Sequence, residues 1–158
     1  MLGSVTPVTV RGISAYFRGK MRLLIVDGDD ALRSLLAKEL EERGIEARQS
    51  CSGDEAFYVW QQSGPWELVL SEYQFIPGVK INDGMQLLTA IHGINPLQQM
   101  AIMVSGPKEA RRELPQALRG LSVLRKLFRV EQLIRLLRQP VLPLSRFHLP
   151  LTAAVLTS

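Results

Sequence analysis

The sequence is poor in the residues that build disulfides and metal centres. It contains one cysteine, Cys51, and two histidines, His92 and His148. A single cysteine excludes an intramolecular disulfide, and a cysteine-based zinc site needs several thiolates. The histidines show no metal-ligand spacing. We therefore interpret Cys51 as a packing or surface residue in a reducing compartment, and both histidines as surface or partly buried side chains.

Long hydrophobic runs are also absent. No stretch reaches the roughly 20 apolar residues that span a bilayer, and residues 1–20 lack the continuous apolar block of a signal peptide. We expect a cytoplasmic protein without membrane association. Residues 1–20 are expected to form a loose N-terminal extension, and residues 21–139 the folded domain. Residues 140–158 are apolar without a clear period, and we expect a C-terminal tail there.

Charge is spread unevenly, although the net charge is only +4. Residues 21–107 carry 6 Lys and Arg against 12 Asp and Glu, a balance of −6. Residues 108–138 carry 9 against 3, a balance of +6. A concentrated basic surface favours acidic partners or nucleic acid, and a solvated helix face is the alternative interpretation. Aromatic side chains are scarce in the basic segment and no helix-turn-helix follows it, which ranks nucleic-acid binding low.

Short apolar runs alternate with helical patterns between residues 22 and 138. The predicted strands are Arg22–Val26, Ile45–Gln49, Glu67–Ser71, Met100–Val104 and Leu121–Leu124. The predicted helices are one that begins at Asp29 or Asp30 and ends at Gly44, then Gly53–Gln62, Asp83–Ile91, Lys108–Leu118 and Arg129–Arg138. We expect Pro115 to kink or shorten the fourth helix. The buried face of the first helix is predicted to carry Leu32, Leu35, Leu36 and Leu40.

This alternation predicts an α/β fold, a doubly wound five-stranded parallel sheet with five helices. Such sheets bind ligands outside the carboxyl ends of their strands. Four polar residues stand at those ends: Asp27, Glu72, Ser105 and Lys126. Clustered carboxylates bind hard cations such as Mg²⁺, and a hydroxyl with an ammonium can bind phosphoryl oxygens. The sequence therefore predicts an acidic pocket suited to a phosphoryl group.

Four segments, in order, resemble response-regulator receiver (CheY-like) domains of two-component signalling. LLIVDGDDALRSLL resembles the opening strand and helix, and WELVLSEYQFIPGVKINDGMQLL the segment with the phospho-acceptor aspartate. MAIMVSGPKEARRELPQALRG resembles the fourth strand with its Ser/Thr, and LSVLRKLFRVEQLIRLL the fifth strand with its lysine. The resemblance covers about residues 21–138. It implies the flavodoxin-like (CheY-like) receiver fold and a role in phosphorelay signal transduction.

The acidic positions depart from the family pattern. Asp27 matches the first of two acidic residues that help hold Mg²⁺, but Gly28 stands where the second belongs. Asp29, one residue further on, is a weak substitute. Glu72 replaces the phospho-acceptor aspartate. We therefore expect Mg²⁺ binding to be weakened or lost, and no other cofactor.

The phosphate-sensing positions are better preserved. Ser105 and Lys126 match the family pattern. Leu127 replaces the proline that normally follows the lysine, and Val123 stands where an aromatic switch residue is expected. The loop before Pro77 is one residue longer than usual.

Glu72 decides between the functional hypotheses. Its extra methylene moves the carboxylate outward by roughly 1.5 Å, and an error near 1 Å can cost about 100-fold in a reaction that depends on placement. The first hypothesis is a degenerate receiver that signals without phosphorylation by binding a partner. The second is a conventional phospho-accepting receiver, and the third a small basic nucleic-acid-binding protein. An independent enzyme is least favoured, because no nucleophile–base pair or cofactor motif is present.

The resemblance places the partner surface on the fourth helix, fifth strand and fifth helix. The partner would be a histidine kinase or a downstream signalling protein, and a homodimer through the same face is also envisaged. The residues assigned to this surface are Arg111, Arg112, Arg119, Val123, Arg129 and Arg135.

Overall fold

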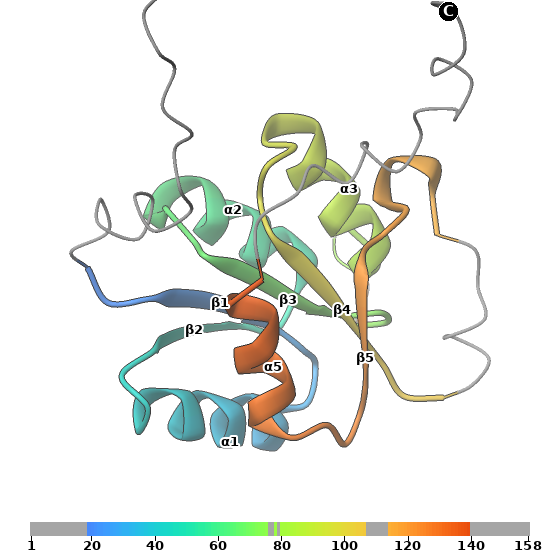
Figure 1. Ribbon diagram of the computed structural model, residues 1–158. Coiled ribbons are helices and arrows are strands. Elements are labelled where there is room, and N and C mark those ends of the chain that lie inside the picture. The colour runs from blue at the N-terminus through green and yellow to red at the C-terminus, as the bar shows by residue number, and fades with distance from the viewer. Residues whose placement is uncertain (1–18, 76–77, 79, 107–113, 140–158) are drawn as a thin grey trace, which may run out of the picture.

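The computed structural model describes residues 19–75, 78, 80–106 and 114–139. In chain order the elements are β1 (Arg22–Val26), α1 (Asp30–Glu41), β2 (Glu46–Ser50), α2 (Gly53–Ser63), β3 (Leu68–Glu72), α3 (Gly84–Ile94), β4 (Met100–Val104), η2 (Gln116–Leu118), β5 (Ser122–Arg125) and α5 (Val130–Leu137) (Figure 1). The strands form one parallel sheet in the order β2-β1-β3-β4-β5. The predicted doubly wound α/β fold is confirmed. Apart from residues 19 and 20, the predicted extension at 1–20 and the tail at 140–158 lie outside the described residues.

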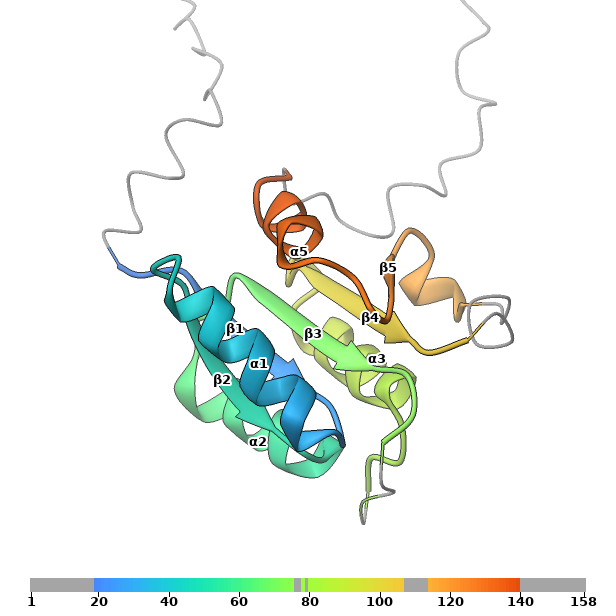
Figure 2. The same ribbon diagram turned by 90° about the horizontal axis from the view of Figure 1, so that it is seen from below.

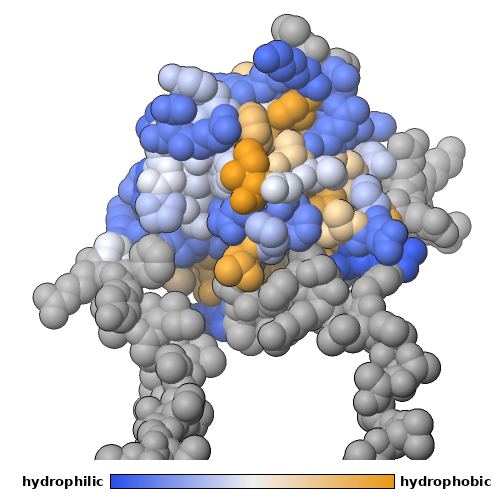
Figure 3. Space-filling model, turned by 90° about the horizontal axis from the view of Figure 1, so that it is seen from above, coloured by the Kyte–Doolittle hydropathy of each residue, from blue (hydrophilic) through white to orange (hydrophobic). Residues whose placement is uncertain are grey.

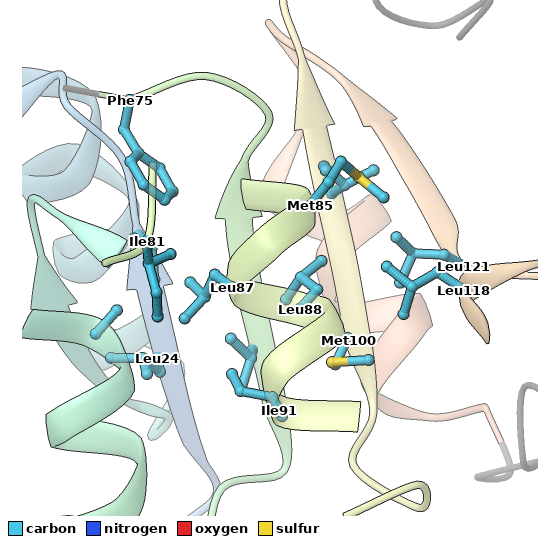
Figure 4. Packing of buried hydrophobic residues seen from close by; sticks show 14 of the residues in the cluster. Leu24, Phe75, Ile81, Met85, Leu87, Leu88, Ile91, Met100, Leu118 and Leu121 are labelled. Carbon is cyan, nitrogen blue, oxygen red and sulfur yellow. The ribbon is translucent and has the colours of Figure 1, made fainter. Parts of the chain in front are cut away.

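Strand periodicity builds a core on each face of the sheet. Successive side chains of a strand point to opposite faces, so Leu24 of β1 joins the core beneath α2 and α3, while Leu23 joins the core beneath α1 and α5. Figure 4 shows the first of these cores, with Leu87, Leu88 and Ile91 of α3 turned toward the sheet. Figure 2 shows the helices on both sides of the strands. Both faces are therefore covered, as a parallel sheet requires.

Polar caps fix where three of the helices begin. The side chain of Asp29 accepts a hydrogen bond from the Leu32 amide, and Ser52 and Asp83 cap α2 and α3 in the same way. The turn after α1 places Gly44 at φ 78°, a conformation that glycine adopts without steric cost. These caps fix the first turns of α1, α2 and α3.

One residue predicted to lie on the buried face of the first helix is exposed in the structure. Leu36 and Leu40 are buried as expected, but Leu35 is 55% exposed, and Arg33 is buried instead. The prediction for Leu35 is therefore wrong. The guanidinium of Arg33 donates to the main-chain oxygen of Asp27, which stabilises a polar group on the inner face. An apolar periodicity alone does not reveal this contact.

The second difference between prediction and structure concerns the fourth predicted helix, Lys108–Leu118. Its residues up to 113 lie outside the described residues. Over the described remainder there is no α-helix, only η2, which begins directly after Pro115. Proline lacks a backbone N–H and cannot continue an α-helix from a preceding turn. The described residues thus contain four α-helices, and none of these is long and apolar enough to cross a membrane.

Candidate functional site

The structure brings Asp27, Glu72 and Lys126 together at the carboxyl rim of the sheet. Asp27 directly follows β1, Glu72 ends β3, and Lys126 directly follows β5. The Lys126 Nζ atom lies 2.8 Å from Asp27 Oδ2 and 2.8 Å from Glu72 Oε1. Three residues far apart in the chain therefore form one ion-paired cluster, which we call the rim triad.

Each carboxylate oxygen of the rim triad has a partner within the protein, but the buried Asp27 Oδ2 has only its ion pair with Lys126 and no hydrogen bond. Asp27 Oδ1 accepts a hydrogen bond from the Asp29 amide at 2.8 Å, and Glu72 Oε2 accepts one from the Gly28 amide at 2.9 Å. The other oxygen of each carboxylate pairs with Lys126. The triad is therefore closed on itself by an ammonium and two backbone N–H groups.

The charged side chains of the rim triad are largely buried, so each strongly affects the pKa values of the others. The Asp27 side chain is 0% exposed, and those of Lys126 and Glu72 are 15% and 17% exposed. Burial by itself would lower the pKa of Lys126, but hydrogen bonds and charge from Asp27 and Glu72 outweigh it and raise that pKa. Burial raises the pKa of Glu72, with a further contribution from the Asp27 charge, although Lys126 and the Gly28 amide oppose the shift.

The raised pKa of Lys126 gives stability a defined pH dependence. A group whose pKa is higher in the folded state stabilises fully below its unfolded pKa, and that contribution is lost as pH rises through the folded value. Wild-type stability should therefore fall more steeply above about pH 10.5 than that of Lys126→Met. Urea unfolding across the alkaline range measures the difference. Parallel curves for the two proteins would show that Lys126 gains nothing from its carboxylate partners.

The rim offers a cation such as Mg²⁺ two carboxylates that already pair with an ammonium. The Lys126 ammonium occupies the position between the two carboxylates, and Gly28 supplies no side chain. The Asp29 carboxylate caps α1 by accepting from the Leu32 amide at 3.1 Å. Among the described residues no three Asp, Glu, His or Cys side chains gather into a set that could hold a metal ion. No step through a metal follows from this arrangement.

Arg33 is a site residue that sequence reasoning missed. Its guanidinium donates to the main-chain oxygen of Asp27 and forms an ion pair with Asp30. It thus fixes the segment that carries the first carboxylate of the rim triad. The spacing of Asp30 and Arg33, three residues apart on a helix, is a sequence signal for the ion pair, but nothing in it indicates burial.

Asp54 is the second missed residue, and it fixes the loop that follows Glu72. Its carboxylate accepts hydrogen bonds from the amides of Lys80 and Ile81, the latter at 3.0 Å. A side chain at Gly78 would lie 2.4 Å from Asp54 Oδ2, so the loop packs closely against this carboxylate. The first turn of α2 therefore holds the loop between β3 and α3.

Asp54→Ala should destabilise the protein by about 1 kcal/mol, because two backbone donors lose their acceptor. The effect should be concentrated in residues 78–82, where amide hydrogen exchange should become faster. Asp30→Ala, which removes an exposed carboxylate in the first turn of α1, is the control and should leave that loop unchanged. Equal exchange of the loop in both variants would show that Asp54 does not hold it.

The other predicted site residues are placed as follows. Ser105 directly follows β4 and is exposed at the same rim; Val104 of β4 is in register with Arg125, which precedes Lys126. Val123 is exposed on β5. Arg119, Arg129 and Arg135 are exposed, whereas Arg111 and Arg112 lie outside the described residues. Leu127 is exposed, and the peptide bond joining it to Lys126 is cis.

These features define an α/β domain with a carboxylate–lysine cluster at the carboxyl ends of parallel strands. No family model matches the chain, and no curated protein matches it. Solved structures do. Chemotaxis protein CheY4 of Vibrio cholerae has a TM-score of 0.63 at 20% identity, over 78% of this chain and 100% of that chain.

Two further structures give the same result. A CheY-like receiver domain protein of Methanospirillum hungatei JF-1 has a TM-score of 0.62 at 18% identity, over 74% of this chain and 90% of that chain. The receiver domain of hybrid histidine kinase CckA has a TM-score of 0.55 at 27% identity, over 72% of this chain and 93% of that chain. The structural neighbours are consistently CheY-like receiver domains of response regulators. The chain therefore has the receiver fold.

Proposed function

We propose that this chain is a receiver-type signalling module that works without phosphorylation and acts by binding a protein partner. The observation that carries the proposal is the bridge of Lys126, at 2.8 Å from both Asp27 and Glu72. The receiver fold of the structural neighbours supports a signalling role of the response-regulator type. The rim triad supports the finer statement that the pocket is held in one arrangement by its own residues.

Glu72 is poorly suited to accept a phosphoryl group. One of its oxygens pairs with Lys126 and the other accepts from the Gly28 amide. Attack on a phosphodonor would have to break one of these contacts in a pocket that lacks a fitting metal site to neutralise the donor. The carboxylate instead supplies a permanent negative charge, on a side chain longer than aspartate, to the lysine that follows β5. A charge supplied by phosphorylation biases a two-state domain in the same sense.

The partner surface proposed for this module is that of β5, α5 and the segment of the fourth predicted helix that precedes β5, and Lys126 of the rim triad lies between β5 and α5 in the chain. Its described members Arg119, Val123, Arg129 and Arg135 are exposed. The surface is basic, which favours an acidic protein surface, and electrostatic steering would make association depend on salt. A histidine kinase or a downstream signalling protein is the proposed partner, and a second copy of the chain through the same surface is the other arrangement.

The test is phosphoryl transfer from acetyl phosphate with Mg²⁺, followed by intact-protein mass spectrometry. Wild type and Glu72→Ala should both gain no stable phosphoryl group. A matched gain-of-function variant, Gly28→Asp with Glu72→Asp, restores an acid pair and a shorter acceptor. A side chain at position 28 would meet only an ordinary contact, 3.6 Å from Glu72 Oε2. A stable, Mg²⁺-dependent adduct on wild type that Glu72→Ala abolishes would instead establish a conventional phospho-accepting receiver.

A further inference from the structure

An apolar groove lies between α1 and the segment that joins β5 to α5. Both helices pack on the same core, so the groove opens on the face of the sheet that they cover. Its cavity of about 90 Å³ is lined by leucines of α1 together with Leu127 and Phe128. Leu127 is 95% exposed and Leu35 is 55% exposed. Removing exposed leucine side chains from water is favourable, so the groove has the character of an interface centre.

The two sides of the groove carry opposite charge. Residues 29–43, which comprise α1 and its flanks, have 5 Asp and Glu against 3 Lys and Arg, a balance of −2. Residues 128–139, which comprise α5 and its flanks, have 3 Arg against 1 Glu, a balance of +2. Lys126 also lines the groove, but both carboxylates of the rim triad already pair with it. The face is therefore acidic on the α1 side and basic on the α5 side.

Ion pairs within the chain leave this asymmetry in place. Arg33 pairs with Asp30, and Arg43 at the end of α1 pairs with Glu131 of α5 at 3.2 Å. Beyond these two pairs, the α1 side has a balance of −3 and the α5 side one of +3. The remaining charges are Asp29, Lys38, Glu39, Glu41 and Glu42 on the α1 side, and Arg129, Arg135 and Arg138 on the α5 side.

Proximity across the groove does not cancel the remaining charges. Glu39 and Arg129 line the same polar hollow between the helices. With that pair set aside as well, the two sides keep balances of −2 and +2. None of the side chains that then remain forms an ion pair within the part of the chain that the structure describes.

We propose that a second copy of this chain covers the groove, in a two-fold symmetric dimer that places the α1 side of each copy against the α5 side of the other. A two-fold interface requires one surface that is complementary to itself. An axis along the groove meets this requirement, because it exchanges the acidic and the basic side. Leu35 and Leu127 of both copies then lie at the centre with charges around them, the usual arrangement of an apolar interface core and a polar rim.

The charge pattern favours a second copy over a partner of one sign. An acidic protein or a nucleic acid would be attracted to α5 and repelled by α1, and like charges brought together across an interface are costly. A second copy offers both signs in the matching order by symmetry. The inference rests on the proposed function in that the module acts by binding a protein, and it names that protein.

This interface differs from one through the outer face of β5. Leu124 of β5 packs in the core beneath α1 and α5. Successive side chains of a strand point to opposite faces, so Val123 and Arg125 point away from the groove. Substitutions at Val123 and on α1 therefore distinguish the two arrangements.

Exposed leucine also occurs on the opposite layer, which provides a matched control. Figure 3 shows the face covered by α2 and α3, where hydrophobic side chains lie among hydrophilic ones. Leu97, in the turn between α3 and β4, is 59% exposed. Association driven by exposed apolar surface in general would be as sensitive to Leu97 as to Leu35.

The experiment is sedimentation equilibrium of the full chain with reversed charges. A basic variant carries Glu41→Arg and Glu42→Arg, and an acidic variant carries Arg135→Glu and Arg138→Glu. Wild type should form a reversible dimer. Each variant alone should associate at least about 100-fold more weakly, because both sides of its groove then have the same sign. An equimolar mixture of the two variants should recover the dimer, since every basic side then meets an acidic one. Circular dichroism checks that both variants are folded.

A second pair of variants tests the apolar centre. Leu35→Gln should raise the dissociation constant of the dimer by about tenfold or more, because each dimer loses two leucines. Leu97→Gln should leave the dissociation constant unchanged.

Four outcomes would overturn the proposal. Wild type would remain a monomer at every concentration, the mixture of folded charge variants would fail to associate, or the dimer would respond to Leu97→Gln and not to Leu35→Gln. The fourth is a dimer that both charge variants retain and that Val123→Asp abolishes, which would place the interface on β5. No phosphodonor enters these measurements, so failure here and failure of the proposed function are distinguishable.

Discussion

Replacing Lys126 by methionine is expected to lower the free energy of unfolding by about 3 kcal/mol at neutral pH. Methionine keeps most of the length and apolar stem of lysine but removes the ammonium. Asp27, which is fully buried, and Glu72 would then face each other without a counter-charge. Removing one member of a buried ion pair costs about 3–5 kcal/mol, because the remaining charge stays desolvated. Urea unfolding monitored by circular dichroism gives the value.

Two further variants separate this effect from a general loss of lysine. Lys38→Met removes an exposed lysine from α1 and should change stability by less than about 0.5 kcal/mol. Adding Glu72→Gln to Lys126→Met removes one of the two unpaired carboxylates and should recover part of the loss. A Lys126→Met protein as stable as Lys38→Met would contradict the ion-paired triad.

Gly84→Ala is expected to cost about 3 kcal/mol or more. Gly84 begins α3, and a Cβ placed on it would lie 2.0 Å from the main-chain oxygen of Glu72 and 2.9 Å from Ser71 Oγ. Backbone cannot move aside as the end of a flexible side chain can, so α3 would have to retreat from β3. Overpacking of this kind costs 1–3 kcal/mol and occasionally more. The displaced backbone belongs to Glu72, so the rim triad should be disturbed too.

A second glycine in the same helix provides the control. Gly93 has nothing within 4 Å of the position its Cβ would take. Gly93→Ala should therefore stabilise the protein by up to about 1 kcal/mol, since alanine favours helix more than glycine does. Thermal or urea unfolding of the two variants should give shifts of opposite sign. Equal and small shifts would mean that α3 does not approach Glu72 as closely as the structure shows.

Elements with strong local signals could be predicted closely from the sequence. β1 and β4 have the predicted bounds, because their apolar runs are buried on both faces and end at polar residues. α2 differs from prediction by one residue at its end, and α5 by one residue at each end. β2 is a polar edge strand whose burial is partial, so its pattern was weaker and its bounds moved by one residue.

What could not be predicted depended on contacts between distant residues. The exposure of Leu35 and the burial of Arg33 follow from the main-chain oxygen of Asp27, which periodicity does not represent. Asp54 looks like an ordinary acidic residue in the first turn of a helix, and its role follows from a loop 26 residues further on. Such contacts exist only once the sheet has brought the segments together.

The candidate site likewise has features that could be predicted from the sequence and features that could not. The parallel-sheet rule was enough to gather Asp27, Glu72 and Lys126, because all three stand at strand ends. It could not show that Gly28 contributes through its amide, as the donor to Glu72 Oε2. Nor could it show that the Asp29 carboxylate is used as a helix cap. The main departure from the family pattern is glutamate at the acceptor position. Its physical consequence becomes clear only from the contacts that the structure shows.

A receiver that works without phosphorylation requires that Lys126 keeps the rim triad closed. Amide resonances of the full-length protein, recorded with and without Mg²⁺ and beryllofluoride, test this most directly. We predict that the amides of Gly28, Glu72 and Lys126 keep their positions in wild type, while the Gly28→Asp, Glu72→Asp variant shifts at the same three positions. Saturable, Mg²⁺-dependent shifts of these amides in wild type would show that the triad opens to a phosphoryl analogue and would contradict the account.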